Sequence, residues 1–533
     1  MTGEEFVSRV ALGPWPAFRN GERLDQAADI FLLAFYADAS EDELGDLGID
    51  DLAQLAHDFW IWRSERAPQE QAVRIRPGIG AGGRNLARDI LEIAGPDMPF
   101  LVDSVMGEIA DQMIAPLAMF HPIAPSVSGE GRDSLIQVHV PPLSPARAAA
   151  LHEGIRGTLA DVRACVADFA AMKRSMLDRA NELSRARTNA PAEEVAEGVA
   201  LLRWLASDRF TFLGARDYQY SRDEAGRLLP DEPVILEATG LGVLRDPERY
   251  VLRSSAEPFL LTPQLQRLIE EPIPIIVSKS TLRARVHRRT ESDYIGVKRY
   301  GADGEVIGET RFVGLFGADA FTEPTREIPM LRRKVEWIMR EAGFQPGGHS
   351  YKTLGHILES YPRDELWQSS QEELAHNARG ILHLLDRPRP RVFTRRDRFN
   401  RFVSALAFLP KDRFNSTLRT AVGKRLEEAF GGHVESFFPN LGEGPLARVH
   451  FVITDIDKSR ADPDPRQLDA DIAALTRTWE DGFARALDDA DAFDAKARPD
   501  VLRRFGGAFT AAYRERYGVD EALIDVAQIV AGR

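Results

Sequence analysis

The chain has 533 residues, of which 44% are hydrophobic, and a formal net charge of −14 at pH 7. This length can bury several separate cores, so we expect roughly three or four domains, and the negative charge repels nucleic acids and anionic lipid surfaces. A single cysteine, Cys165, excludes an internal disulfide and a thiolate metal site. No apolar run reaches the roughly 18 residues of a membrane span, and the first residues lack the apolar run of a signal peptide. We therefore expect a cytoplasmic protein without membrane or nucleic-acid partners.

The first 187 residues predict a helical lead-in and then a small α+β domain. Apolar residues recur at helical spacing over 24–36 and 50–66, and residues 1–70 are assigned to the lead-in. Sequence patterns then predict strands around Val73 and Leu91, a helix over 98–115, strands over 119–127 and 134–140, and long helical patterning over 144–187. The order strand, helix, strand, strand, helix favours a sandwich over residues 71–187, with helices on one face of an antiparallel sheet.

Residues 191–386 predict a sheet-rich domain and a helical connector. A helix is expected over 191–207, and the sheet domain is assigned to 191–320. Its expected strands cover 210–215, 218–220, 275–278, 284–288, 294–300 and 306–315. Asp303-Gly304 is typical of a tight hairpin between the last two strands. Helices expected over 326–342, 351–360 and 364–385 form the connector, residues 321–386.

The third region, residues 391–495, follows a proline-punctuated linker and repeats the order of the first domain. A strand is expected over 402–409, a helix over 417–430, strands over 434–438 and 447–454, and a helix over 467–487. Asn415 or Ser416 can cap the first of these helices, and Gly431 can end it. The common order predicts a structural repeat without a sequence repeat, and residues 496–533 are expected to form helices that lead into a further region.

One glycine motif has the spacing of a dinucleotide fingerprint. Gly78, Gly80 and Gly83 satisfy G-x-G-x-x-G, with Asp103 twenty residues beyond. Such glycines must open a long helix, but only eleven residues separate Gly83 from Gly95, and they include strand-like alternation. We interpret the motif as a loop.

Other signals of chemistry are weak. The sequence contains no phosphate-binding loop, no paired-histidine zinc motif and no nucleophile elbow. His349 and His356 have no cysteine or carboxylate at the spacing of metal ligands. Seven arginines fall between residues 387 and 401, offset only by Asp397. In an acidic chain this run favours a strand edge or contacts with acidic residues of another domain over a nucleic-acid stripe.

Several short segments resemble the large NAD-specific glutamate dehydrogenases of bacteria. The first is Asp-Met-Pro-Phe-Leu-Val-Asp-Ser-Val at 97–105. The others, in collinear order, are 210–214, 240–245, 293–299, 326–335, 361–366 and 395–399. The likeness runs from about residue 28 to the end. Because the matching segments occur in the same order, chance does not explain them.

The resemblance implies an α+β multidomain chain. Two ACT-like domains (ferredoxin-like, βαββα) would flank a PAS-like sheet domain, with helical connectors. It also implies homo-oligomers that oxidise glutamate to 2-oxoglutarate with NAD. The chain stops at Arg533, before a nicotinamide-binding fold or catalytic lysines would appear. We therefore expect no cofactor and no catalytic residue in this chain, NAD in the full-length enzyme, and a truncated or split product that is inactive alone. Its expected partners are further copies through the ACT-like domains, the catalytic region of the same enzyme, and an amino-acid effector.

ACT domains generally bind amino acids where the first strand meets the first helix, because backbone N–H groups and the helix dipole favour a carboxylate there. The candidate residues of the two loops are Asp97, Pro99, Phe100, Asp103 and Ser104 in the first, and Lys411, Asp412, Arg413 and Asn415 in the second. Interdomain packing is the other use for these loops, and the one we favour. Two hypotheses follow: a regulatory and assembly segment of an oxidoreductase, and a stand-alone amino-acid-binding module without an attached enzyme.

Overall fold

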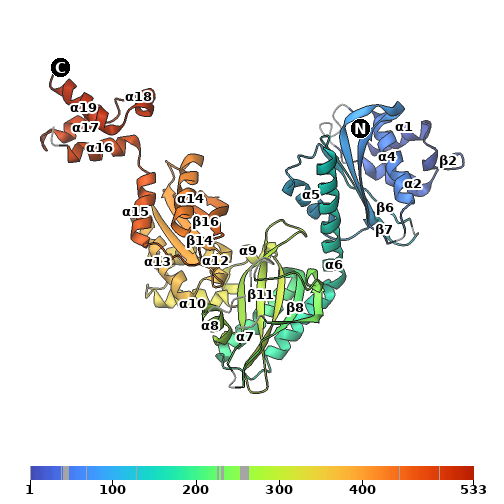
Figure 1. Ribbon diagram of the computed structural model, residues 1–533, viewed down its shortest axis with the longest axis horizontal. Helices are drawn as coiled ribbons and strands as arrows, with labels where there is room; N and C mark the ends of the chain where they lie inside the picture. The colour runs from blue at the N-terminus through green and yellow to red at the C-terminus, as the bar shows by residue number, and fades with distance from the viewer. Residues whose placement is uncertain are drawn as a thin grey trace. The chain divides into compact units, whose positions relative to one another are not determined.

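The computed structural model describes residues 2–37, 39, 47–67, 69–127, 129–224, 227–229, 233–252, 263–442, 444–490 and 493–532 (Figure 1). It divides into two compact units. Unit 1 contains residues 1–323 and 327–330, and unit 2 contains residues 324–326 and 331–533.

The N-terminal helices of unit 1 cover one face of a sheet. They are α1 (Gly3–Leu12), α2 (Gln26–Phe35) and α4 (Ile49–Ser64), with a small ribbon of β1 (Arg19–Asn20) and β2 (Arg23–Leu24) between α1 and α2. The two helices expected in the lead-in are confirmed, and α1, which begins with a Thr2–Glu5 capping box, was not predicted. Their apolar faces share a core with Ala94, Phe120 and Leu135 of the sheet.

The first sheet has the order β3-β4-β7-β5, with β6 also paired to β7. Its elements are β3 (Ala72–Ile79), β4 (Asn85–Pro96), α5 (Leu101–Asp111), β5 (Ala118–Phe120), β6 (Ile123–Pro125), β7 (Arg132–Val140) and α6 (Pro145–Leu183). In Figure 1 the blue sheet lies between α5 and α6 on one side and the N-terminal helices on the other. The strands expected around Val73 and Leu91 are confirmed as β3 and β4, and the strand expected over 119–127 is divided into β5 and β6.

The glycine motif lies in the β3–β4 hairpin. A short turn, η2 (Ala81–Gly83), connects the strands, and Gly82 and Gly83 have φ values of 67° and 80°. These left-handed conformations favour glycine, and no long helix follows. The loop interpretation is confirmed.

A five-stranded antiparallel sheet with the order β10-β11-β12-β8-β9 follows. Its strands are β8 (Phe210–Gln219), β9 (Val234–Gly242), β10 (Ile275–Arg283), β11 (Glu291–Tyr300) and β12 (Val306–Phe316). Helix α6 packs on it, and α7 (Ala192–Trp204) packs on α6 with Gly198 close to Ile275 of β10. The segment η3 (Leu205–Arg209) leads into β8, and α8 (Pro263–Glu270) precedes β10. The Gly304 hairpin is confirmed, with φ 90°.

Three sequence expectations are wrong in this sheet. Strand β8 is continuous across 210–219 and absorbs its irregularity as a bulge, whereas two strands were expected. Strand β9 was missed. Residues 284–288 alternate like a strand, but they form the connection between β10 and β11, in which the amide and the ring of His287 contact α5 of the first domain.

Unit 2 begins with helices that cover one face of the third sheet. After α9 (Ala318–Thr322) of unit 1 and η5 (Thr325–Glu327), they are α10 (Leu331–Glu341), α11 (His349–Ser360), α12 (Arg363–Gln368) and α13 (Gln371–Asp386). The single helix expected over 364–385 is wrong, because a capping box between Ser370 and Glu373 starts α13 anew.

The third sheet has the order β13-β14-β16-β15 and repeats the order of the first, including its leading strand. Its elements are β13 (Arg391–Arg396), β14 (Val403–Pro410), α14 (Ser416–Phe430), β15 (His433–Asn440), β16 (Leu446–Thr454) and α15 (Pro465–Leu475). Asn415 caps α14 and Gly431 ends it with φ 66°, as predicted. The structural repeat is therefore confirmed, and β13 is a leading strand that was not among the strands expected in this region.

The chain then continues into a cluster of helices: α16 (Trp479–Asp489), α17 (Arg498–Phe505), α18 (Ala511–Arg516) and α19 (Val519–Val530). They share an apolar core that includes Phe483 and Val526. The continuous helix expected over 467–487 is wrong, since a Thr478–Asp481 capping box separates α15 from α16.

Buried charges tie the helical layers to both repeated sheets. Glu92 of β4 is fully buried and accepts hydrogen bonds from Arg74, Arg76 and Gln137, and Arg74 also donates to the carbonyl of Asp58 in α4. In the third sheet Arg395 donates two hydrogen bonds, of 2.7 and 2.8 Å, to Glu365 of α12. Other arginines of the run contact Asp397, Asp462 and Asp469 of their own domain, so of these contacts only the one to Glu365 reaches an acidic residue of another predicted region.

Candidate functional site

The first candidate loop connects β4 to α5 and has an unusual backbone. Phe100 caps α5 in the left-handed region, with φ 71°. Its carbonyl accepts a 2.5 Å hydrogen bond from the hydroxyl of Ser104, which is almost fully buried. Asp97 and Pro99 are exposed, and the carboxylate of Asp103 also reaches the surface.

A segment of the second sheet binds this loop. The connection between β10 and β11, residues 284–290, is here called the clamp hairpin. The backbone N–H of His287 donates to Ser104 Oγ at 3.0 Å, and its Nδ1 lies 3.0 Å from Asp103 Oδ2. The His287 ring also lies 5.2 Å from the ring of Phe100. Three of the predicted site residues, Phe100, Asp103 and Ser104, therefore meet one residue that lies more than 180 positions later in the chain.

Arg289 makes the most buried contact of the clamp hairpin. Its guanidinium donates to Glu108 Oε2 at 2.7 Å, to Thr158 Oγ1 at 2.8 Å and to the Ser104 carbonyl at 3.3 Å. The side chains of Arg289 and Glu108 are only 11% and 10% exposed. Burial alone would raise the pKa of Glu108, but hydrogen bonds from Gln112 and Thr158 and the charges of Arg289 and Arg285 lower it overall.

One helix also joins the first two sheets. Helix α6 has 39 residues, about 58 Å at 1.5 Å per residue. Its first half packs on α5 and β3, and its second half packs on β8 and β9. Asp161 and Asp168 of α6 each accept two hydrogen bonds from an arginine of the segment after β9, namely Arg249 and Arg245.

Behind that segment lies a fully buried guanidinium. Arg216 of β8 is 1% exposed, and it donates to Tyr218 Oη and to the carbonyls of Leu244, Asp246 and Arg249. These acceptors can satisfy all five N–H donors of an arginine. Arg216 thus fixes the backbone that presents Arg245 and Arg249 to α6, and this is a structural role.

The second candidate loop, between β14 and α14, is held in a comparable way within unit 2. Arg413 donates to the carbonyl of Thr476 at 2.9 Å and to Asp481 Oδ2 at 2.5 Å, at the start of α16. Lys411 Nζ donates to the carbonyl of Gly442 at 2.7 Å, Asn415 caps α14, and Asp412 is exposed. Both predicted loops are therefore bound by other segments of their own unit.

Sequence reasoning missed the residues that bind the first loop. His287, Arg289 and Thr158 lie far from it in the sequence, and Glu108 was hidden within an ordinary amphipathic helix. The one available signal was the cationic alternation over 284–288, which was interpreted as a strand. For the second loop, the T-x-x-D capping box at Thr478 could have located the start of α16.

Cys165 lies in α6 and is buried. Its thiol donates to the carbonyl of Leu213, and burial raises its pKa to about 12. A thiolate is the reactive form of cysteine, so we expect this residue to be unreactive in the folded protein. Over the described residues, no group of three or more histidine, cysteine or acidic side chains is arranged to hold a metal ion.

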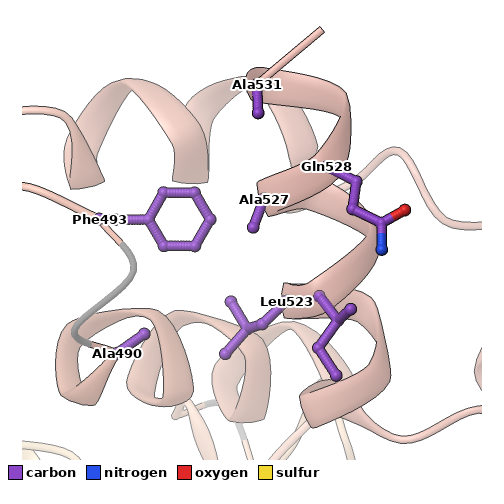
Figure 2. A pocket seen from close by; sticks show the side chains of 7 residues that line it. Ala490, Phe493, Leu523, Ala527, Gln528 and Ala531 are labelled. Atoms are coloured by element: carbon purple, nitrogen blue, oxygen red, sulfur yellow. The ribbon is translucent and has the colours of Figure 1, made fainter. Parts of the chain in front are cut away.

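The C-terminal helices carry an apolar groove beside α19, which Figure 2 shows from close by. It is lined by Ala490, Phe493, Leu523, Ile524, Ala527, Gln528 and Ala531. Ile524, Ile529 and Val530 of α19 are each more than half exposed. In the described part of the chain, no helix is both long and apolar enough to span a membrane.

The arrangement defines a class of protein: a chain with two copies of one sheet-and-helix domain, each with a covering helical segment, and a five-stranded antiparallel sheet between them in the sequence. Family models for parts of glutamate dehydrogenase match four segments. They are the ACT1 domain at residues 31–154, helical motif 1 at 328–387, the ACT2 domain at 391–480 and helical motif 2 at 490–531.

Relatives agree with these family models. The NAD-specific glutamate dehydrogenase of Halomonas elongata is 33% identical over 529 residues, which cover 95% of this chain and 32% of that protein. The Pseudomonas aeruginosa enzyme of the same name is 30% identical over 542 residues, again 32% of its length. That of Mycobacterium tuberculosis is 28% identical over 389 residues, 22% of its length. The chain thus spans at most about a third of these relatives. The comparisons support the family of NAD-specific glutamate dehydrogenases and the presence of ACT domains.

Proposed function

We propose that this chain is the N-terminal regulatory and assembly segment of a cytoplasmic, NAD-dependent glutamate dehydrogenase that oxidises glutamate to 2-oxoglutarate. The observation that carries the regulatory part is the clamp hairpin on the first ACT loop. A shift of α5 must move His287 and Arg289, because five hydrogen bonds join them to Asp103, Ser104, Glu108 and Thr158.

Regulation requires two arrangements that bind a ligand with different affinity. A carboxylate bound at the amino end of α5 would compete with Ser104 Oγ for the His287 amide, because both are acceptors. Helix α6 would carry the resulting change into the second sheet, since Asp161 and Asp168 fix its far half to the segment after β9. Asp97, Pro99, Phe100, Asp103 and Ser104 remain the candidate effector residues of this loop, and Lys411, Asp412, Arg413 and Asn415 those of the second.

We further propose that residues 191–320 form a PAS-like domain between ACT-like domains at 71–187 and 391–495. A five-stranded antiparallel sheet with α6 and α7 packed on it supports this proposal. The chain would bind no cofactor itself, and NAD would bind to the catalytic region that completes the enzyme.

For assembly, we propose that the apolar groove beside α19 (Figure 2) receives a helix of the catalytic region. The support is the exposed apolar row on α19 and the length of the relatives, which extend well beyond the matched third. Self-association through the ACT-like domains is the second contact that we propose. Sedimentation of the chain alone tests it: a monomer at all concentrations would remove this contact.

The test of the regulatory proposal is a substitution in one sheet with a readout in the other. Ser104→Ala removes the acceptor of the His287 amide, and we expect faster hydrogen exchange in β10 and β11 as well as in α5. The matched control, Ser144→Ala, removes the amino-terminal cap of α6 away from the clamp hairpin. A change confined to α5 would contradict the proposal, as would formation of NADH from glutamate and NAD by the chain alone.

A further inference from the structure

A second cavity lies in the helical segment that covers the third sheet. It is a groove of about 380 Å³ between α10, α13 and the start of β13, all within unit 2. This volume falls in the ordinary range of small-molecule sites, about 300 to 1,000 Å³. Its lining residues are Trp337, Glu341, Glu372, Ala375, His376, Arg379, Gly380, His383 and Arg391.

The lining combines charged groups of both signs with an aromatic wall. His376, Arg379 and His383 are spaced at i, i+3 and i+7, so they share one face of α13. Trp337 of α10 is half-buried and lines the same groove. Gly380 also lines the groove, and the ring of Phe393 would lie 2.6 Å from a Cβ there, so a larger side chain would require this ring to shift.

Arg391 carries a donor that the described residues do not use. Its Nε is shielded from solvent and has no hydrogen-bond acceptor within the described part of the chain. The nearest carboxylate, Asp469 Oδ2, lies 3.7 Å away. The other oxygen of Asp469 accepts the Val392 amide at 2.8 Å, which holds this carboxylate on the backbone of β13. Because an unsatisfied buried donor costs about 1–3 kcal/mol, a guanidinium in this state favours an added acceptor.

We propose that this groove binds a free α-amino acid as the effector of the segment. The carboxylate of the ligand pairs with Arg391 and Arg379, since guanidinium groups match carboxylates in a bidentate geometry. The ammonium group pairs with Glu341 or Glu372, and the ligand side chain packs on the Trp337 ring. Bound there, the ligand joins the covering helices to the first strand of the third sheet. This site rests on the proposed regulatory function and is separate from both strand–helix loops.

The experiment is titration of the whole chain with the free amino acids, one at a time, by calorimetry and by tryptophan fluorescence. We expect at least one amino acid to bind and to change the fluorescence. Arg391→Gln should weaken its binding at least tenfold, and Trp337→Phe should abolish most of the fluorescence change. Arg389→Gln, an exposed arginine of the same run that does not line the groove, is the matched control and should bind like the wild type.

Unchanged circular dichroism of the variants shows that they fold. If Arg391→Gln bound the amino acid as tightly as the wild type, the ligand would bind elsewhere and this site would be overturned. The regulatory proposal is tested separately, by hydrogen exchange in Ser104→Ala. Absence of binding by every amino acid overturns the site as well. Adenosine monophosphate and inorganic phosphate are titrated in parallel. If either one bound more tightly than every amino acid and lost this binding in Arg391→Gln, the ligand would be a phosphate compound and the proposal would be contradicted.

Discussion

Removal of Arg289 should open the clamp hairpin. In Arg289→Met, Glu108 stays in a pocket where its side chain is 10% exposed, and it keeps only the hydrogen bonds from Gln112 and Thr158. Breaking a buried ion pair from one side costs about 3–5 kcal/mol. Because those two donors remain bonded to Glu108, we expect a smaller cost of about 2–3 kcal/mol for opening the hairpin. That is a rise of about 30- to 140-fold in the opening equilibrium.

The assay is hydrogen exchange of residues 284–290, which reports local opening without requiring a two-state unfolding transition of a multidomain chain. The matched control is Arg283→Met at the end of β10, whose partner Asp111 lies 3.1 Å away but whose side chain is 62% exposed. An exposed pair of this kind contributes at most about 1 kcal/mol. If the two variants opened the hairpin to the same extent, the reasoning from burial would be refuted.

The same variant has a pH signature. The pKa of Glu108 is lowered in the folded chain, so the stability that it contributes is present above the ordinary carboxyl pKa and lost as pH falls through the lowered value. Without Arg289 the folded pKa lies closer to the ordinary carboxyl value, so the loss should be smaller and should be complete at a higher pH. A titration of hairpin exchange between pH 6 and 3 in both proteins measures the difference, and coincident curves would contradict the assignment.

Three further predictions concern buried groups. Arg216→Met leaves the carbonyls of Leu244, Asp246 and Arg249 without their donor, so it should destabilise the second sheet by about 3 kcal/mol or more. The measurement is the urea midpoint for exchange of the slow-exchanging amides of that sheet. A midpoint within 0.2 M of wild type, roughly 0.5 kcal/mol at ordinary urea slopes, would contradict this prediction. Cys165, with its pKa raised to about 12, should resist a thiol reagent at pH 8 until the chain is denatured, and prompt modification of the folded chain would show that the site is open. Burial lowers the pKa of His139 to about 3, so the folded chain binds fewer protons than the unfolded chain between about pH 3 and 6.5. The folded chain therefore loses stability as the pH falls through this window. His139→Gln should make the decline of stability with falling pH less steep, and an unchanged slope of stability against pH would contradict this prediction.

The repeated sheet domains could be predicted from the sequence because local signals agree there. Alternation marks β4 and β14, Asn415 caps α14, and Gly431 ends it. The order of elements follows from these signals alone. Helix breaks at Ser370 and Thr478 were missed although each has a capping-box pattern, because the apolar period continues across both breaks.

The candidate site could be predicted only in part. The loop residues Phe100, Asp103 and Ser104 follow from the strand–helix connection, but what binds them does not. A cationic alternation such as 284–290 fits an edge strand as well as a clamp, and only the fold brings Arg289 to Glu108. Long-range pairs of this kind leave no periodic trace in a single sequence.

The most direct test of the account is the exchange rate of the His287 amide in the unmodified chain. This amide donates to Ser104 Oγ in the other domain. The account predicts slow exchange that parallels the amides of α5 when denaturant is added. Exchange at the rate of an unstructured peptide, with α5 still protected, would show that the two domains are not coupled through the clamp hairpin.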